Sequence, residues 1–282
     1  MEKPTNMTKK IIECVPNVSE GQNTNIINKI ANIIRQTESV KLLDYSKDPD
    51  HDRSVFTFTG SPSSVFKASL DIAKFSIQNI DIRKNKGVHP KIGAIDIIPF
   101  IPVLNTDFDD CWLVAKKLKE KLQSLFEIPI FFYKGNKRQK TDHIENKGIY
   151  TLPELRKQAK TPSCKENFHP TAGAIAIGVR DFLIAYNINL ATNNLKIAQK
   201  IVSKIRERNG GLTGVRALAF FLQKRNLAQV SMNLTTPEAT TKKDAFQFVE
   251  KECRKLDIKI HSEEIIGCLP EDVMNNLNAW IY

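Results

Sequence analysis

Residues 87–103 read GVHPKIGAIDIIPFIPV and join a loop to an apolar run. Gly87 frees the backbone, and Pro90 keeps His89 out of the helical region. The run from Gly93 to Phe100 predicts a strand, so His89 lies on a loop that a rigid strand anchors. An imidazole titrates near pH ~6.5, which makes His89 a candidate acid/base catalyst. On spacing alone, a loop histidine without a role stays an open alternative.

Strands and helices alternate on both sides of this loop in the first half of the chain. The predicted strands cover 11–16, 40–45, 54–59 and 93–100, and the predicted helices cover 23–37 and 62–78. Their order is βαββαβ, the split unit of ferredoxin-like folds. A helix over 107–125 and a strand over 128–133 are expected to follow, and then a polar, basic linker over 134–171.

The second half of the chain repeats this pattern. The predicted elements are strands over 172–179 and 182–190, a helix over 193–208, a hairpin of 215–223 with 227–234, a helix over 237–256 and a strand from 258. We therefore predict an α+β fold of two ferredoxin-like (βαββαβ) subdomains, residues 8–171 with the linker and residues 172–282. Sheets that face each other would leave a cleft for a ligand.

Composition excludes several classes of protein. No apolar run approaches the ~20 residues of a membrane span, and the polar N-terminus is no secretory signal. The five cysteines are scattered without zinc spacing, which predicts free thiols and a cytoplasmic protein without a metal. The net charge of +11 is spread along the chain without a nucleic-acid motif, so a polyanionic small molecule is the expected partner and nucleic acid is not.

The aspartates at 48, 50 and 52 do not form a calcium loop. An EF-hand needs glycine and glutamate at the positions that Arg53 and Thr59 occupy here. A metal site that includes His51 stays an alternative to a polar turn. The chain also has no GxGxxG or Walker motif, so no nucleotide cofactor is expected.

Two other features point to small-molecule binding. Arg53 opens a predicted strand, and its guanidinium suits a carboxylate such as that of glutamate, or a nearby Asp48 or Asp52. Asn187 and Asn189 alternate along a strand and share a face. Gln229, Ser231 and Asn233 repeat the alternation. These amides form either a hydrogen-bonding wall for a ligand or the wet face of a sheet.

Five blocks, in order along residues 12–270, resemble the formiminotransferase family. They are ECVPNVSEG (13–21), DRSVFTF (52–58), HPKIGAIDIIPFIP (89–102), FLIAYNINL (182–190) and QVSMNL (229–234). The resemblance implies two ferredoxin-like subdomains with a folate tunnel between their sheets, in a homodimer. The implied reaction moves the formimino group between N-formimidoyl-L-glutamate and N5 of tetrahydrofolate, in histidine breakdown. Val88 departs from the acidic residue of the animal bifunctional members.

The resemblance also assigns roles to residues. His89 is the expected catalytic acid/base, and Asp44, Arg53, Asn187 and Asn189 are expected to bind the substrate. The expected folate-binding stretch is Cys164, Lys165, Glu166, Asn167, Phe168, His169, Pro170, Thr171, Ala172 and Gly173. Tetrahydrofolate is the expected co-substrate, L-glutamate the product, and the form is monofunctional, without a cyclodeaminase domain. A formyl donor in place of the formimidoyl donor, or a folate-binding relative without activity, stays an alternative.

Overall fold

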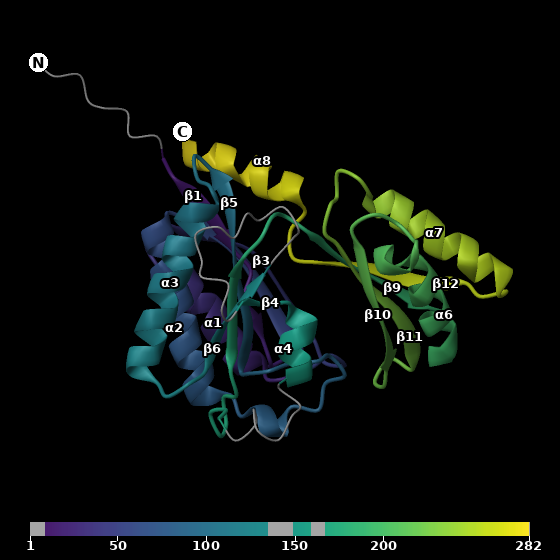
Figure 1. Ribbon diagram of the computed structural model, residues 1–282, viewed down its shortest axis with the longest axis horizontal. Coiled ribbons are helices and arrows are strands. Elements are labelled where there is room, and N and C mark those ends of the chain that lie inside the picture. Colours follow the sequence, from purple (N-terminus) through teal and green to yellow (C-terminus); the bar gives the residue numbers. More distant parts are fainter. Residues whose placement is uncertain (1–8, 135–148, 159–166, 282) are drawn as a thin grey trace, which may run out of the picture.

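The computed structural model describes residues 9–134, 149–158 and 167–281, arranged as two β-sheets that face each other (Figure 1). Helices α1, α2 and α3 cover the outer face of the first sheet, and α6 and α7 cover the outer face of the second. The α+β class predicted from the sequence is confirmed. The inner faces of the two sheets are therefore left to line whatever lies between them.

Within the described residues, the first sheet contains eight strands, all from the first two thirds of the chain. They are β1 (Ile11–Cys14), β2 (Asn17–Val18), β3 (Val40–Asp48), β4 (Arg53–Gly60), β5 (Ile95–Leu104), β6 (Ile130–Lys134), β7 (Ile149–Tyr150) and β8 (Ile175–Val179). Both β1 and β2 lie between β4 and β5, and β3 pairs with the other edge of β4. Beyond β5 the order continues with β8, β6 and β7, which pair in parallel.

The position of β8 differs from the prediction. The strand expected over 172–179 was counted with the second half, whereas β8 lies between β5 and β6 of the first sheet. All five residues of β8 are buried, as in a strand between two parallel neighbours whose faces are both covered. A continuous apolar run gives no information about which sheet the strand joins. The division of the chain at residue 171 stays a prediction.

Three capped helices form the outer layer of the first sheet. They are α1 (Thr24–Gln36), α2 (Pro62–Asn79) and α3 (Phe108–Leu125). The Asn23, Ser61 and Asp107 side chains each accept a hydrogen bond from a backbone N–H of the first turn. Helix α1 buries Ile27, Ile30, Ala31 and Ile34 on one face. Full burial of each isoleucine contributes about 1.5–3 kcal/mol, which holds the helix on the sheet.

The second sheet is antiparallel and has four strands. They are β9 (Ile184–Leu190), β10 (Val215–Leu222), β11 (Leu227–Leu234) and β12 (Ile260–Ile266), in the order β10-β11-β9-β12. The predicted hairpin is confirmed. Helices α6 (Leu195–Ile205) and α7 (Lys242–Lys255) cover its outer face, and the short 3₁₀ helices η1 (Ile82–Lys84) and η2 (Glu207–Asn209) lie in connections. Helix α7 begins later than predicted, because Thr241 and Asp244, not Pro237, form its capping box.

Two α-helices of the described residues were not predicted. Helix α4 (Leu152–Gln158) lies within the expected linker, and α8 (Pro270–Ile281) follows the last strand and buries Val273 and Leu277. In Figure 1, α8 crosses above β1 and β5 of the first sheet. No helix in the described part of the chain is long and apolar enough to cross a membrane. Cys14, Cys111, Cys253 and Cys268 are free thiols, as expected.

Candidate active site

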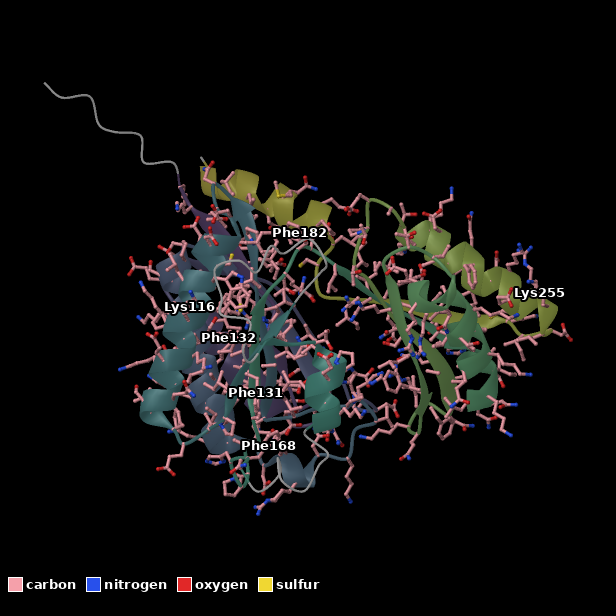
Figure 2. All side chains as sticks on the ribbon, viewed as in Figure 1. Lys116, Phe131, Phe132, Phe168, Phe182 and Lys255 are labelled. Atoms are coloured by element: carbon pink, nitrogen blue, oxygen red, sulfur yellow. The ribbon has the colours of Figure 1, made fainter. Side chains whose placement is uncertain are left out.

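A cavity of about 1040 Å³ lies between the two sheets. One side of the cavity is lined by β3, β4, α4 and residues of the loop 85–94, which we call the His89 loop. The other side is lined by β9 to β12 and η2. Figure 2 shows side chains of both sheets directed into this space. Cations outnumber carboxylates in the described lining, which includes Lys47, Arg53, Arg156, Arg206, Arg208, Arg216, Lys224, Arg225, Asp48, Asp50, Glu207 and Glu264. A cleft with this charge attracts anionic small molecules.

His89 lines the cavity in a defined tautomer. Its Nδ1 lies 2.8 Å from the backbone oxygen of Pro90, and its Nε2 lies 2.7 Å from Nη1 of Arg53. A carbonyl oxygen only accepts and a guanidinium only donates, so we assign the proton to Nδ1 and the lone pair to Nε2. Nε2 is therefore the nitrogen of His89 that can act as a base.

The surroundings of His89 favour its neutral form. Burial lowers its pKa well below 6.5, and the nearby charges of Arg53 and Arg156 lower the pKa further, followed by His51. The hydrogen bond to the Pro90 carbonyl acts in the opposite direction and raises the pKa. At neutral pH this imidazole therefore carries no charge and keeps its lone pair on Nε2.

Arg53 has few partners of its own. It begins β4, and its buried Nε has no hydrogen-bond partner in the part of the chain that the structure describes. Within the described residues no carboxylate pairs with it. Asp48 pairs with Arg225, and Asp52 accepts from the backbone of Gly21 and Lys86, so the pairing considered from the sequence is wrong. Burial lowers the pKa of Arg53 to about 10, and the guanidinium still carries a charge at neutral pH.

Arg156 adds a second cation beside His89. It comes from α4, and its Nη2 lies 3.3 Å from Oδ2 of Asp96. The other carboxylate oxygen of Asp96 accepts a hydrogen bond of 2.6 Å from the backbone N–H of Ile92. Asp96 therefore holds both the His89 loop and α4. Sequence reasoning missed Arg156, because it lies in the segment interpreted as a linker.

His51 begins a hydrogen-bond chain that crosses between the two sheets. Its Nε2 donates to Oε1 of Gln229 at 2.8 Å, and Nε2 of Gln229 donates to Oδ1 of Asn189 at 2.9 Å. Asn189 in turn donates to Glu264 and Ser262. No group of three His, Cys, Asp or Glu side chains in the described ranges could hold a metal ion. The Nε2 atom of His51 is therefore occupied by the Gln229 side chain.

Arg225 joins the two halves at the tip of the β10–β11 hairpin. Its guanidinium reaches Asp48 at 2.5 Å, Asp50 at 2.9 Å and Glu264 at 2.7 Å. The Asp50 side chain is fully buried and also accepts a hydrogen bond from the backbone N–H of Lys224. We call Arg225 with these three carboxylates the Arg225 clamp. Nothing in the local sequence predicts it, since a basic residue in a hairpin turn is ordinarily solvated.

The predicted substrate-binding residues lie in different surroundings. Arg53 and Asn187 line the cavity, and Asn187 is 6% exposed. Asn189 is 1% exposed and belongs to the series of hydrogen bonds that begins at His51. It is not among the described residues that line the cavity. Asp44 lies on β3 opposite Thr57, also outside the described lining, and burial raises its pKa.

The predicted folate-binding stretch packs behind the His89 loop. Cys164, Lys165 and Glu166 lie outside the described residues, and none of residues 167–173 is in the described cavity lining. The backbone of this stretch pairs with the loop: Ala94 donates to the Ala172 carbonyl at 2.8 Å. Gly173 has a φ of +71°, and a Cβ there would collide with the Ile92 carbonyl. The stretch therefore supports the loop in this structure.

Aromatic and polar side chains of the same stretch also have structural contacts. Phe168 lies next to Phe131, with ring centres 6.2 Å apart (Figure 2). The Nδ1 atom of His169 accepts a hydrogen bond of 3.0 Å from the backbone N–H of Ala172. This bond holds the turn that precedes β8.

Two family models match the chain over almost its whole length. One is described as "Formiminotransferase domain, N-terminal subdomain" and matches residues 11–180. The other is described as "Formiminotransferase domain" and matches residues 185–282. The gap between them, residues 181–184, covers the connection between the two sheets and the first residue of β9.

Curated relatives come from several kingdoms. A glutamate formimidoyltransferase of Thermoplasma acidophilum is 38% identical, over 94% of this chain and 89% of its own. A glutamate formimidoyltransferase of Streptococcus pyogenes serotype M1 is 36% identical, over 93% of this chain and 89% of its own. A formimidoyltransferase-cyclodeaminase of Rattus norvegicus is 36% identical over 93% of this chain but only 50% of its own length.

Proposed function

Because the chain belongs to the formiminotransferase family, we propose that it moves a formimidoyl group between N-formimidoyl-L-glutamate and N5 of tetrahydrofolate. This is the activity named for its archaeal and streptococcal relatives. The observation that carries it is His89, neutral and with its Nε2 lone pair defined, in a cationic cavity of about 1040 Å³. A cavity of this size has room for two anionic substrates together.

The proposed mechanism uses His89 as a proton carrier. N5 of tetrahydrofolate attacks the formimidoyl carbon, and the new N–C bond forms as Nε2 takes the proton from N5. The bond from the carbon to the glutamate nitrogen then breaks, and Nε2 returns the proton to that nitrogen. Such acid/base catalysis contributes about 10²–10⁴-fold, and the alignment of two substrates in one cavity contributes the remainder.

Finer features of the family are part of the proposal. The connection order and strand order of each half support two ferredoxin-like subdomains, and the cavity supports a folate tunnel between them. Asp44, Arg53, Asn187 and Asn189 are proposed to bind substrate, and residues 164–173 are proposed to bind folate. We further propose a cytoplasmic homodimer that acts in histidine breakdown, with tetrahydrofolate as co-substrate and without a metal.

A formyl donor is the second candidate, and the two arginines beside His89 favour it. Attack on a formyl group develops negative charge on oxygen, which Arg53 and Arg156 would stabilise, whereas a protonated formimidoyl group loses its positive charge as it is attacked and develops no such anion. The test is turnover of the purified protein with tetrahydrofolate and either N-formimidoyl-L-glutamate or N-formyl-L-glutamate. We expect faster transfer from the formimidoyl donor. Faster transfer from the formyl donor would assign a different substrate to the same site.

The pH dependence follows from the lowered pKa of His89. Because the neutral form is the base, and the native pKa lies below 6.5, activity is retained as the pH falls through 6.5 and is lost only near the lower native pKa. We expect the acid limb of kcat/KM, measured from pH 5 to 8, to have its midpoint below 6.5. A midpoint at or above 6.5 would contradict the assigned surroundings of His89.

A further inference from the structure

We propose that Arg53 is a cap on the catalytic base and that a carboxylate of the glutamate-type substrate removes it, so that substrate binding itself frees Nε2 of His89. The inference rests on the proposed function for the identity of the substrate. It gives Arg53 a positioning role in addition to carboxylate binding. Three observations carry it: the contact between Arg53 and His89, the few partners of Arg53, and the second arginine nearby.

The first observation is the contact itself. Nε2 of a neutral imidazole has one lone pair, and Nη1 of Arg53 lies 2.7 Å from it. Nδ1 is already committed to the Pro90 carbonyl and carries the proton. While Arg53 donates to Nε2, His89 has no free nitrogen with which to accept a proton from N5. The base must therefore be uncovered before the chemical step.

The second observation is that Arg53 can gain by changing partner. Among the described residues its buried Nε has no hydrogen-bond partner, and no carboxylate pairs with its guanidinium. A guanidinium offers a planar fork of donors that matches a carboxylate in two parallel, charge-assisted hydrogen bonds. Arg53 lines the cavity, so a carboxylate bound there offers a stronger partner than a neutral imidazole.

The third observation is that Arg156 does not share this freedom. Arg156 is paired with Asp96, whose carboxylate also holds the His89 loop through the Ile92 N–H. The groups that face His89 are Arg53 from β4, Arg156 from α4, His51 from the β3–β4 turn and the ring of Phe220 from β10. Of the two arginines, Arg53 is the one whose charge a substrate carboxylate can neutralise.

Neutralising Arg53 has a second effect on the base. Its positive charge lowers the pKa of His89, so a carboxylate on Arg53 raises that pKa toward its ordinary value. His89 then becomes both accessible and more basic when the substrate is bound. The donor carboxylate should accordingly contribute to kcat and not only to KM, since its binding is used to prepare the chemical step.

Kinetics with a shortened donor separate a cap from a simple anchor. We compare N-formimidoyl-L-glutamate with N-formimidoylpropylamine, which lacks both carboxylates, in the wild type, Arg53→Leu and the exposed control Arg254→Leu. In the wild type and the control the shortened donor should lose about 10²-fold in kcat. Arg53→Leu should use the shortened donor about tenfold faster than the wild type does, because His89 is no longer covered. If the wild type and Arg53→Leu turn over the shortened donor at equal rates, Arg53 only anchors the carboxylate, and the cap is overturned.

A titration without chemistry tests the same step independently. Glutarate carries two carboxylates and no transferable group, and nitrogen NMR reports the tautomer and pKa of His89, assigned by comparison with His89→Gln. Glutarate should raise the His89 pKa in the wild type and leave it unchanged in Arg53→Leu. No change in the wild type would overturn the cap even if formimidoyl transfer is observed. If glutarate raises the His89 pKa but no formimidoyl transfer is observed, the cap is supported and only the proposed function is contradicted.

Discussion

Formimidoyl transfer by His89→Gln is expected to fall by about 10²–10⁴-fold in kcat, while tetrahydrofolate binds with unchanged affinity. The amide of glutamine approximates the volume of imidazole and can accept a hydrogen bond from Arg53, but it cannot take and return a proton. His89 is one of many groups that line a large cavity, so its loss removes little binding surface. Steady-state turnover and a folate binding titration on the same preparation measure the two effects.

A matched variant separates this role from a general effect of losing a histidine. His261 is exposed on β12, outside the described cavity lining, and His261→Gln should retain normal turnover. The urea unfolding midpoints of both variants should remain near that of the wild type. Turnover of His89→Gln within a few-fold of the wild type would assign the proton transfer to another group.

Arg225→Met is expected to destabilise the protein by about 2–4 kcal/mol, because it leaves a buried carboxylate without its cation. The Asp50 side chain is fully buried, and the neighbouring Asp48 and Glu264 carboxylates would repel each other and Asp50. The Arg225 side chain is 29% exposed, so the lower part of the range is expected. Urea unfolding measures the loss, and separate transitions for the two halves would show that the clamp couples them.

Lys255→Met is the control for the clamp. The Lys255 side chain is 54% exposed and pairs with Glu252, whose side chain is 7% exposed and which keeps Lys204 as a second partner. Because the lost cation is exposed and Glu252 retains Lys204, we expect the loss to cost about 0–1 kcal/mol. If Arg225→Met and Lys255→Met lower the free energy of unfolding by the same amount, the clamp contributes no more than an ordinary ion pair.

The fold was predictable where local patterns determine the element. Isoleucines at helical spacing correctly indicated α1, and two β-rich runs around a short polar turn correctly indicated the β10–β11 hairpin. Helix α4 was missed because seven residues within a basic segment give no clear period. The partner strands of β8 were missed because strand pairing depends on tertiary structure, which a buried apolar run does not encode locally.

The site was predictable only in part, for the same reason. His89 and Arg53 were recognised from their own neighbours in sequence, and the structure brings them within 2.7 Å of each other. The contacts of Arg156 and of Gln229 with this region come from elements distant in sequence. Alternation along β11 suggested a polar face, but not that Gln229 would face His51. The geometry that selects the tautomer of His89 therefore required the structure.

The place of β8 determines when the first half of the chain can be completed during synthesis. Strand β6 pairs with β8 and β7, and among the described strands it reaches β5 only through β8. A ribosome must therefore translate residues up to Val179 before β6 can be incorporated next to β5. Until then the edge of β5 is open to other chains, which is where a stalled or truncated product would aggregate.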